Sequence, residues 1–198
     1  MADTYYTIQH EGEGIYKEKM SKFISFAFHV SSTDEAKDLI KQHQNIYHDA
    51  RHVCWAYVLG PDKATWQLND NGEPSGTAGK PILGQIHSFD LTDVLVIVVR
   101  YFGGIKLGTP GLIAAYREAA RLALENAGKK EMHQMDFLKF SFPYVVANDV
   151  MKIIKSEDIE VLDRNFDTSC EMSISFRMDD SNKIRGRILN ISGVSQLD

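Results

Sequence analysis

The sequence predicts an α+β fold in two domains, and three observations support this prediction. Runs of β-branched and aromatic residues alternate with segments of helical periodicity along the chain. A polar segment at residues 129–136 separates two such series. The chain has 198 residues and is 43% apolar, which is enough for one large or two small hydrophobic cores. We therefore expect an N-terminal domain at residues 1–130 and a C-terminal domain at residues 131–198.

The first elements of the N-terminal domain are predicted from residue type and length. Residues 22–30 and 53–59 are rich in aromatic and β-branched side chains and predict two strands. Ser32 or Thr33 can cap a helix that has acidic residues in its first turn. Residues 93–100 are almost continuously apolar, which predicts a strand covered on both faces at the centre of a sheet.

A long helix follows this central strand. Thr109 can act as its N-cap and Pro110 can occupy the first helical position, where the missing N–H has no cost. Gly128 is a suitable C-terminal stop. The sequence therefore predicts a helix that fills most of residues 109–128.

The C-terminal domain shows a βαββα series after a polar, turn-like connection at residues 129–136. Strand 136–144 places four apolar residues on one face: Leu138, Phe140, Phe142 and Tyr144. Helices are expected at residues 147–156 and 181–191, with two strands between them. This is the order of a ferredoxin-like α/β sandwich, with little chain left for a final strand.

Charge and cysteine content exclude several classes of function. The net charge of −5 disfavours general electrostatic attachment to nucleic acid or to an anionic membrane, so any such binding has to be local. Cys54 and Cys170 lack CxxC spacing, which argues against a disulfide framework or a zinc knuckle. The N-terminus lacks the pattern of a secretory signal, and no apolar run has the length of a membrane helix. We therefore expect a cytoplasmic protein.

The glycine-rich stretch at residues 69–85 does not fit the common catalytic loops. Pro74 and Pro81 stand where a Walker phosphate loop needs glycine and Ser or Thr. A nucleophile elbow needs glycine on both sides of Ser75, but Glu73 and Thr77 are there. Two interpretations remain: the glycines let backbone N–H groups approach an anion, or they only form a turn that supports its neighbours.

Histidine and cysteine do not form a recognisable metal or nucleophile site. His48 and His52 have the i, i+4 spacing of a zinc site, but Asp49 stands in place of the glutamate of a zincin. Cys54 lies on the same strand face as His52, at a spacing too long for direct activation. We expect structural or solvated histidines, a core cysteine and no metal.

The segment from Arg100 to Lys106 follows the buried strand and leads into a helix N-terminus. Its cations and its two aromatic residues can stack on a nucleotide and neutralise its phosphate, or they can simply cover the core.

Four stretches identify the chain as resembling the IMPACT family, and within it the two-domain, YigZ-like bacterial proteins. They read SKFISFAFHV, ARHVCWAYVLG, NGEPSGTAGKPIL and DVLVIVVRYFGGIKLGTPGLIAAY. The resemblance implies an N-terminal βα domain like the second domain of a ribosomal small-subunit protein and domain IV of elongation factor G. It also implies a C-terminal domain like the last domain of that factor. Such kinship implies association with RNA or the ribosome. Eukaryotic members of the family are translational regulators that bind the activator of a starvation-responsive kinase.

Two hypotheses about function follow. The first is a non-catalytic, translation-linked protein that binds RNA, the ribosome or a translation-related protein, without cofactor, membrane contact or DNA sequence readout. The second is a small-molecule hydrolase or phosphotransferase, in which at least three of Glu73, Ser75, Thr77, Lys80 and His52 converge on a glycine-lined anion site. The candidate binding residues are Glu73, Ser75, Gly76, Thr77, Gly79, Lys80, Arg100, Tyr101, Phe102, Gly103, Gly104, Lys106, Gly108 and Thr109.

Overall fold

The computed structural model of the protein describes residues 3–166 and 169–197. The chain divides into two compact units, Tyr5–Met132 and Met1–Thr4 with His133–Asp198. We call them the N-terminal unit and the C-terminal unit and describe each by itself.

A five-stranded antiparallel sheet forms the centre of the N-terminal unit. Its strands, in spatial order, are β2 (Gly12–Glu18), β3 (Ser21–His29), β6 (Val94–Tyr101), β4 (His52–Leu59) and β5 (Thr65–Asn69). The apolar strand β6 is the middle strand, as the sequence predicts, and all its residues but Tyr101 are buried.

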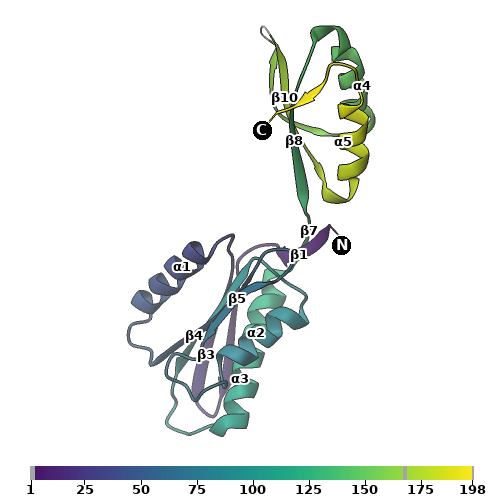
Figure 1. Ribbon diagram of the computed structural model, residues 1–198. Helices are drawn as coiled ribbons and strands as arrows, with labels where there is room; N and C mark the ends of the chain where they lie inside the picture. Colours follow the sequence, from purple (N-terminus) through teal and green to yellow (C-terminus); the bar gives the residue numbers. More distant parts are fainter. Residues whose placement is uncertain (1–2, 167–168, 198) are drawn as a thin grey trace. The chain divides into compact units, whose positions relative to one another are not determined.

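Helices cover both faces of this sheet (Figure 1). Helix α1 (Thr33–Ile46) packs on one face, and α2 (Gly79–Ser88) and α3 (Gly108–Ala127) pack on the other. Alternate residues of β6 therefore enter two separate cores: Val94, Val96 and Val98 face α2 and α3, whereas Leu95, Ile97 and Val99 face α1. The hydroxyl of Ser32 accepts the amide hydrogen of Glu35, so the predicted cap of α1 is Ser32.

Two elements near the glycine-rich stretch are absent from the sequence prediction. Strand β5 precedes the stretch, and α2 begins within it at Gly79. Helix α2 contains Gly84, which is unfavourable for helix by intrinsic propensity, whereas Pro81 lies in the first turn, where its missing N–H has no intrahelical partner. Burial of the apolar side chains of α2 against the sheet overrides the propensity of Gly84.

The predicted start of the long helix is wrong by two residues. Helix α3 begins at Gly108 with Leu107 as the cap residue, so Thr109 is not the N-cap and Pro110 is the third helical residue. Gly108 has a φ of +71°, which glycine adopts without strain and which lets the chain enter the helix earlier. Gly128 ends the helix as predicted, with a φ of +69°.

The segment predicted as a polar turn contains a strand instead. Strands β1 (Thr4–Ile8) and β7 (Lys129–His133) pair in a two-stranded sheet. The ammonium of Lys129 lies 3.9 Å from the centroid of the Tyr6 ring. The local sequence of β7 is polar and shows no strand pattern. The strand forms because it pairs with β1, more than a hundred residues away in the chain, and this explains the error.

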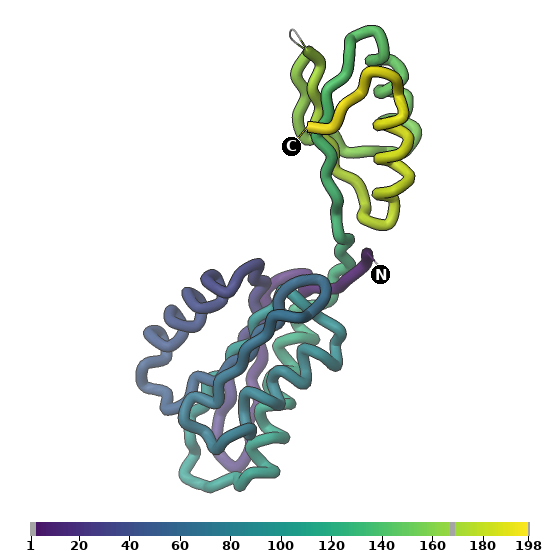
Figure 2. Tube along the Cα trace, in the orientation of Figure 1, coloured from purple at the N-terminus to yellow at the C-terminus, as the bar shows by residue number. Residues whose placement is uncertain are grey.

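The C-terminal unit has the predicted ferredoxin-like topology. The sheet order is β11-β8-β10-β9, and both helices lie on one side of the sheet (Figure 2). Its elements are β8 (Met135–Phe142), the short helix η1 (Tyr144–Val146), α4 (Ala147–Ser156), β9 (Glu160–Phe166), β10 (Cys170–Arg177), the short helix η2 (Met178–Asp180), α5 (Ser181–Leu189) and β11 (Ser195–Gln196).

Three of the four predicted core residues of β8 are buried. They are Leu138, Phe140 and Phe142. Tyr144 is 79% exposed, because the strand ends before Pro143 and the tyrosine starts η1. The short β11 completes the sheet next to β8.

Asp136 joins β8 to the start of α5. Its carboxylate accepts hydrogen bonds from Arg185 at 2.9 and 3.0 Å and from the hydroxyl of Ser181 at 2.6 Å. The hydrogen bonds from Arg185 are the main cause that lowers the pKa of Asp136 to about 2.

Replacing Asp136 by asparagine is expected to destabilise the C-terminal unit by about 1–2 kcal/mol at pH 7. A carboxyl with a lowered folded pKa stabilises the fold above its unfolded pKa of about 4, and this contribution disappears as the pH falls through about 2. Hydrogen exchange of the α5 amides in the full chain, at pH 7 and near pH 2.5, measures the difference. An effect of equal size at both pH values would contradict this assignment.

Candidate functional site

A buried ion pair lies where the two glycine-containing segments meet. The Nη1 atom of Arg100 donates to Oε1 of Glu73 at 2.6 Å, and the hydroxyl of Tyr116 donates to the same oxygen at 2.8 Å. The side chains of Glu73 and Arg100 are 3% and 7% exposed. Because both charges are largely removed from water, each depends on the other for compensation.

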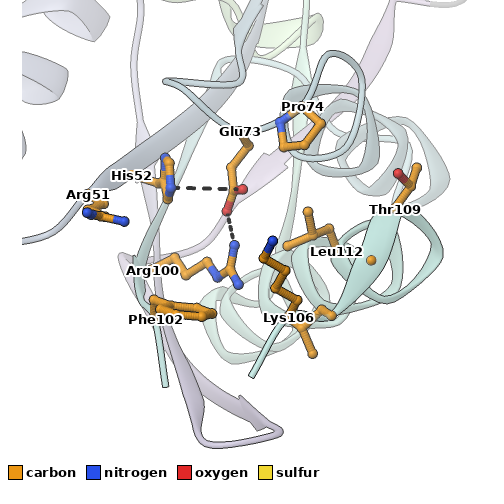
Figure 3. Close-up of a pocket in the computed structure, with 11 residues that line it drawn as sticks. Arg51, His52, Glu73, Pro74, Arg100, Phe102, Lys106, Thr109 and Leu112 are labelled. Carbon is orange, nitrogen blue, oxygen red and sulfur yellow. Dashed lines mark hydrogen bonds and ion pairs between the residues drawn. The ribbon is translucent and has the colours of Figure 1, made fainter. Parts of the chain in front are cut away.

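Strand register explains the position of Arg100. Arg100 stands opposite Phe23 of β3 and His52 of β4, so these three side chains form one row across the sheet. Its guanidinium carbon lies 5.5 Å from the ring centroid of Phe23 and 5.6 Å from that of Phe102. Figure 3 shows the guanidinium between Glu73 and the ring of Phe102. Among the residues that the structure describes, Nε of Arg100 is buried and has no hydrogen-bond partner.

His52 presents one ring nitrogen to the ion pair. Its Nδ1 lies 2.8 Å from the carbonyl oxygen of Asn71, which can only accept, so Nδ1 carries a proton. Its Nε2 is 3.9 Å from Oε2 of Glu73. When the imidazole is neutral, Nε2 is therefore an acceptor at the edge of the site.

A pocket of about 380 Å³ opens above the ion pair (Figure 3). Two further cations, Arg51 and Lys106, line it, and so do the first residues of α3. Among its described lining residues Glu73 is the one carboxylate, and Arg100 already compensates that charge. The pocket is therefore suited to an anion, with the positive end of the α3 dipole beside it. Its lining residues are Arg51, His52, Glu73, Pro74, Arg100, Phe102, Lys106, Leu107, Gly108, Thr109 and Leu112.

The amides of the glycine-rich loop are occupied by a carboxylate of the chain itself. Oδ2 of Asp70 accepts from the N–H of Gly76 at 2.8 Å, and Oδ1 accepts from Ala78 at 3.0 Å and from Gly79 at 2.8 Å. Asp70 thus caps α2 from outside the helix and orders the loop that positions Glu73. An external anion does not find these N–H groups free.

The structure brings six of the candidate binding residues together around the pocket. They are Glu73, Arg100, Phe102, Lys106, Gly108 and Thr109. The glycine-rich stretch and the segment that begins at Arg100 therefore meet at one surface, through the pair of Glu73 and Arg100.

The other candidates lie around this surface but do not line the pocket. Ser75 is exposed. The hydroxyl of Thr77 donates to the carbonyl oxygen of Pro74 at 2.6 Å, and that of Tyr101 donates to Asp49 at 2.8 Å. Gly103 packs against the backbone of Met20, whereas Gly104 has open space and a φ of +91°. Lys80 and Gly76 line a second pocket, described below.

The convergence that the hydrolase hypothesis expects does not form. Among its five residues, Glu73 and His52 approach each other, whereas Ser75 is exposed and the hydroxyl of Thr77 is bonded to backbone. The geometry provides a proton acceptor and an anion pocket without an activated hydroxyl nucleophile among these side chains.

Several residues of the site are absent from the candidates that the sequence suggests. Arg51, Leu107 and Leu112 lie within the family stretches, but nothing in those stretches sets them apart from their neighbours, and the fold brings them to the pocket. Cys54 is fully buried under it, with Sγ 3.0 Å from the carbonyl oxygen of Asp70 and 3.4 Å from the hydroxyl of Tyr116. Burial raises the pKa of the Cys54 thiol to about 12 and also raises the pKa of Tyr116. The cysteine is accordingly a core residue, as predicted.

No helix among the described residues is both long enough and apolar enough to cross a bilayer. The same part of the chain contains no cluster of three or more His, Cys, Asp or Glu side chains arranged to hold a metal.

Comparison with known proteins gives consistent matches. A family model for the Impact N-terminal domain matches residues 19–124. The chain is 38% identical over 144 residues to the IMPACT family member YvyE of Bacillus subtilis strain 168, covering 73% of this chain and 66% of YvyE. It is 42% identical over 108 residues to the IMPACT family member YigZ of Escherichia coli strain K12, covering 54% of this chain and 53% of YigZ. The matched stretches thus span about half to two thirds of these relatives.

One solved structure matches along the whole chain. The crystal structure of a hypothetical protein aligns with a TM-score of 0.73 over 100% of this chain and 98% of that one. At 24% identity, this likeness supports the fold alone.

Proposed function

This chain belongs to the IMPACT family, as its sequence predicts, and from that premise we propose that it is a translation-linked protein whose N-terminal unit binds single-stranded RNA without catalysis. We further propose that it acts in the cytoplasm, alone or on the ribosome, and that its two units are separate domains with a boundary near residue 131.

One observation is the main support for this proposal: the pocket combines a half-exposed aromatic ring with three cations. Phe102 is 47% exposed, and Arg51, Arg100 and Lys106 surround it. A base stacks on an exposed aromatic ring whatever its sequence, and flanking cations neutralise the phosphates. RNA duplexes keep their bases stacked inside, so a ring of this kind favours an unpaired strand.

The buried ion pair supports the same assignment. Glu73 fixes Arg100 against the Phe102 ring, so the cation is already in place before a ligand arrives. Preorganised groups lose less conformational entropy on binding. The site therefore has a rigid floor made of Glu73 and Arg100 and an exposed rim made of Arg51 and Lys106.

The double variant Arg51→Ala/Lys106→Ala is expected to weaken binding of a fluorescein-labelled hexauridylate at least tenfold in fluorescence anisotropy. The matched control Lys37→Ala/Lys41→Ala removes two exposed charges from α1, on the opposite face of the sheet, and should leave the affinity unchanged within about twofold. The two exposed cations of this pocket alone predict a salt slope of about −1.4, so the wild-type affinity should fall at least about sevenfold between 50 and 200 mM salt.

The same measurement can refute the RNA assignment. Lack of salt-sensitive binding to hexauridylate, together with no co-sedimentation with ribosomes, would exclude it. A pull-down that then recovers a translation factor would assign the pocket to a protein partner instead.

A further inference from the structure

A second basic pocket adjoins the candidate site on the same helix. Its volume is also about 380 Å³. Lys80 of α2 and Arg117 of α3 line it, and no carboxylate is among its described lining residues, which are Gly76, Lys80, Pro81, Gly84, Gln85, Ile113 and Arg117. Gly76 and Gly84 add no side chains to the pocket, so they leave space between the two cations.

Neither of these cations has a carboxylate partner in the described part of the chain. Lys80 and Arg117 are both exposed and enter no ion pair there. By contrast, Arg121, one helical turn further along α3, pairs with Glu118 and Glu125. The positive charge of the second pocket is thus available to a ligand, whereas that of Arg121 is already neutralised.

The loop at residues 74–76 contributes to both pockets. Pro74 lines the first pocket and Gly76 the second. On α3, Thr109 and Leu112 line the first, and Ile113 and Arg117 line the second. Positions 109, 113 and 117 form one i, i+4, i+8 row along the helix surface.

The side chain of Lys80 lies against this loop. A Cβ atom placed on Gly76 would lie 3.4 Å from Cδ and 3.9 Å from Nζ of Lys80. The absence of a side chain at Gly76, which has a φ of +77°, therefore lets the lysine stem pack closely against the loop.

We propose that the second pocket holds a downstream phosphate of the same RNA strand, so that one strand runs along α3 from Phe102 to Arg117. This inference rests on the proposed function of the first pocket. Thr109 and Arg117 are separated by about 12 Å along the helix axis. A stacked strand advances about 3.4 Å per nucleotide, so the path accommodates three or four nucleotides. The occupant is single-stranded RNA, because both pockets offer cations and the first adds a stacking ring.

The length of the oligonucleotide separates the two pockets experimentally. We expect Lys80→Ala/Arg117→Ala to weaken binding of labelled hexauridylate about tenfold at 50 mM salt and to reduce the magnitude of the salt slope by about 1.4. Labelled diuridylate fills the first pocket alone, so its affinity should change less than twofold. Arg121→Ala is the matched control, since it removes a neutralised cation from the same helix and should leave both affinities unchanged.

Each other outcome overturns a defined part of the inference. Suppose that wild-type protein binds hexauridylate and that Arg51→Ala/Lys106→Ala weakens this binding, but Lys80→Ala/Arg117→Ala does not. The assignment of the second pocket is then wrong, and the proposed function stands. If wild-type protein binds no hexauridylate, this inference fails, and if it also does not co-sediment with ribosomes, the proposed function fails with it. Equal weakening of both oligonucleotides would indicate a general field effect rather than a second site. Equal affinity for duplex RNA would exclude the single-strand assignment. Circular dichroism and thermal melting verify that both variants fold.

Discussion

Replacing Glu73 by glutamine is expected to lower the free energy of unfolding of the N-terminal unit by about 3 kcal/mol. The substitution keeps the shape of the side chain but leaves the guanidinium of Arg100, 7% exposed, without a compensating charge. Breaking a buried pair by removing one charge is costly, because the remaining charge stays out of water. For a unit of this size the loss corresponds to a fall in melting temperature of roughly 10 °C.

Glu118→Gln is the matched control for this experiment. Glu118 pairs with Arg121 on α3, but both side chains are 36% exposed, so the loss should stay below about 1 kcal/mol. Urea denaturation of both variants measures the contrast. A loss in Glu73→Gln no larger than that of Glu118→Gln would show that the buried pair does not stabilise the fold.

The Glu73 variant also separates structure from binding. Because Glu73 holds Arg100 against the Phe102 ring, the fraction that remains folded should bind hexauridylate more weakly than wild type. Equal or tighter binding by the folded fraction would mean that Glu73 only stabilises the unit and does not position Arg100 for binding.

Replacing Gly103 by alanine is expected to destabilise the N-terminal unit by about 3 kcal/mol, at the upper end for overpacking. A Cβ atom there would lie 2.0 Å from the carbonyl carbon and 2.2 Å from the carbonyl oxygen of Met20, and 2.5 Å from the amide nitrogen of Ser21. These are backbone atoms at the start of β3, so no side-chain rotation relieves the overlap. Either the hairpin of β2 and β3 or the loop that holds Phe102 and Lys106 therefore has to move.

Gly84→Ala provides the matched control for Gly103→Ala. Gly84 lies inside α2, and nothing lies within 4 Å of the added methyl group. Alanine has the higher helix propensity, so this variant should be neutral or more stable by up to about 1 kcal/mol. Equal melting temperatures for the two variants would contradict the close packing of Gly103. RNA affinity of folded Gly103→Ala should also fall, whereas a purely structural glycine would leave it unchanged.

The sequence predicts much of the fold because many elements carry a local pattern. The apolar run of β6 identifies the central strand, because a strand without a polar face has to be buried on both faces. The βαββα series of the C-terminal unit follows from alternation in β10 and helical spacing in α4. The likeness to domains of elongation factor G stays a prediction.

The errors occur where distant contacts override local preference. Strand β7 reads as a polar turn but pairs with β1, and α2 forms despite Gly84 because its apolar side chains are buried. In the candidate site, Arg51 and Leu112 lie within family motifs, but only the fold shows that they line the pocket. A pattern of neighbouring residues contains no information about such encounters.

The fold class, the family and the two segments of the candidate site can be predicted from the order of the residues, because the hydrophobic periods, the glycines and the family motifs are all local patterns. Which charges meet is visible only once the chain is folded. The tertiary structure places Glu73 against Arg100, gives the loop amides to Asp70, and leaves Lys80 and Arg117 without a carboxylate partner in the described chain. Ion pairs and hydrogen bonds depend on distances of a few ångströms between residues far apart in the chain, and only folding fixes those distances.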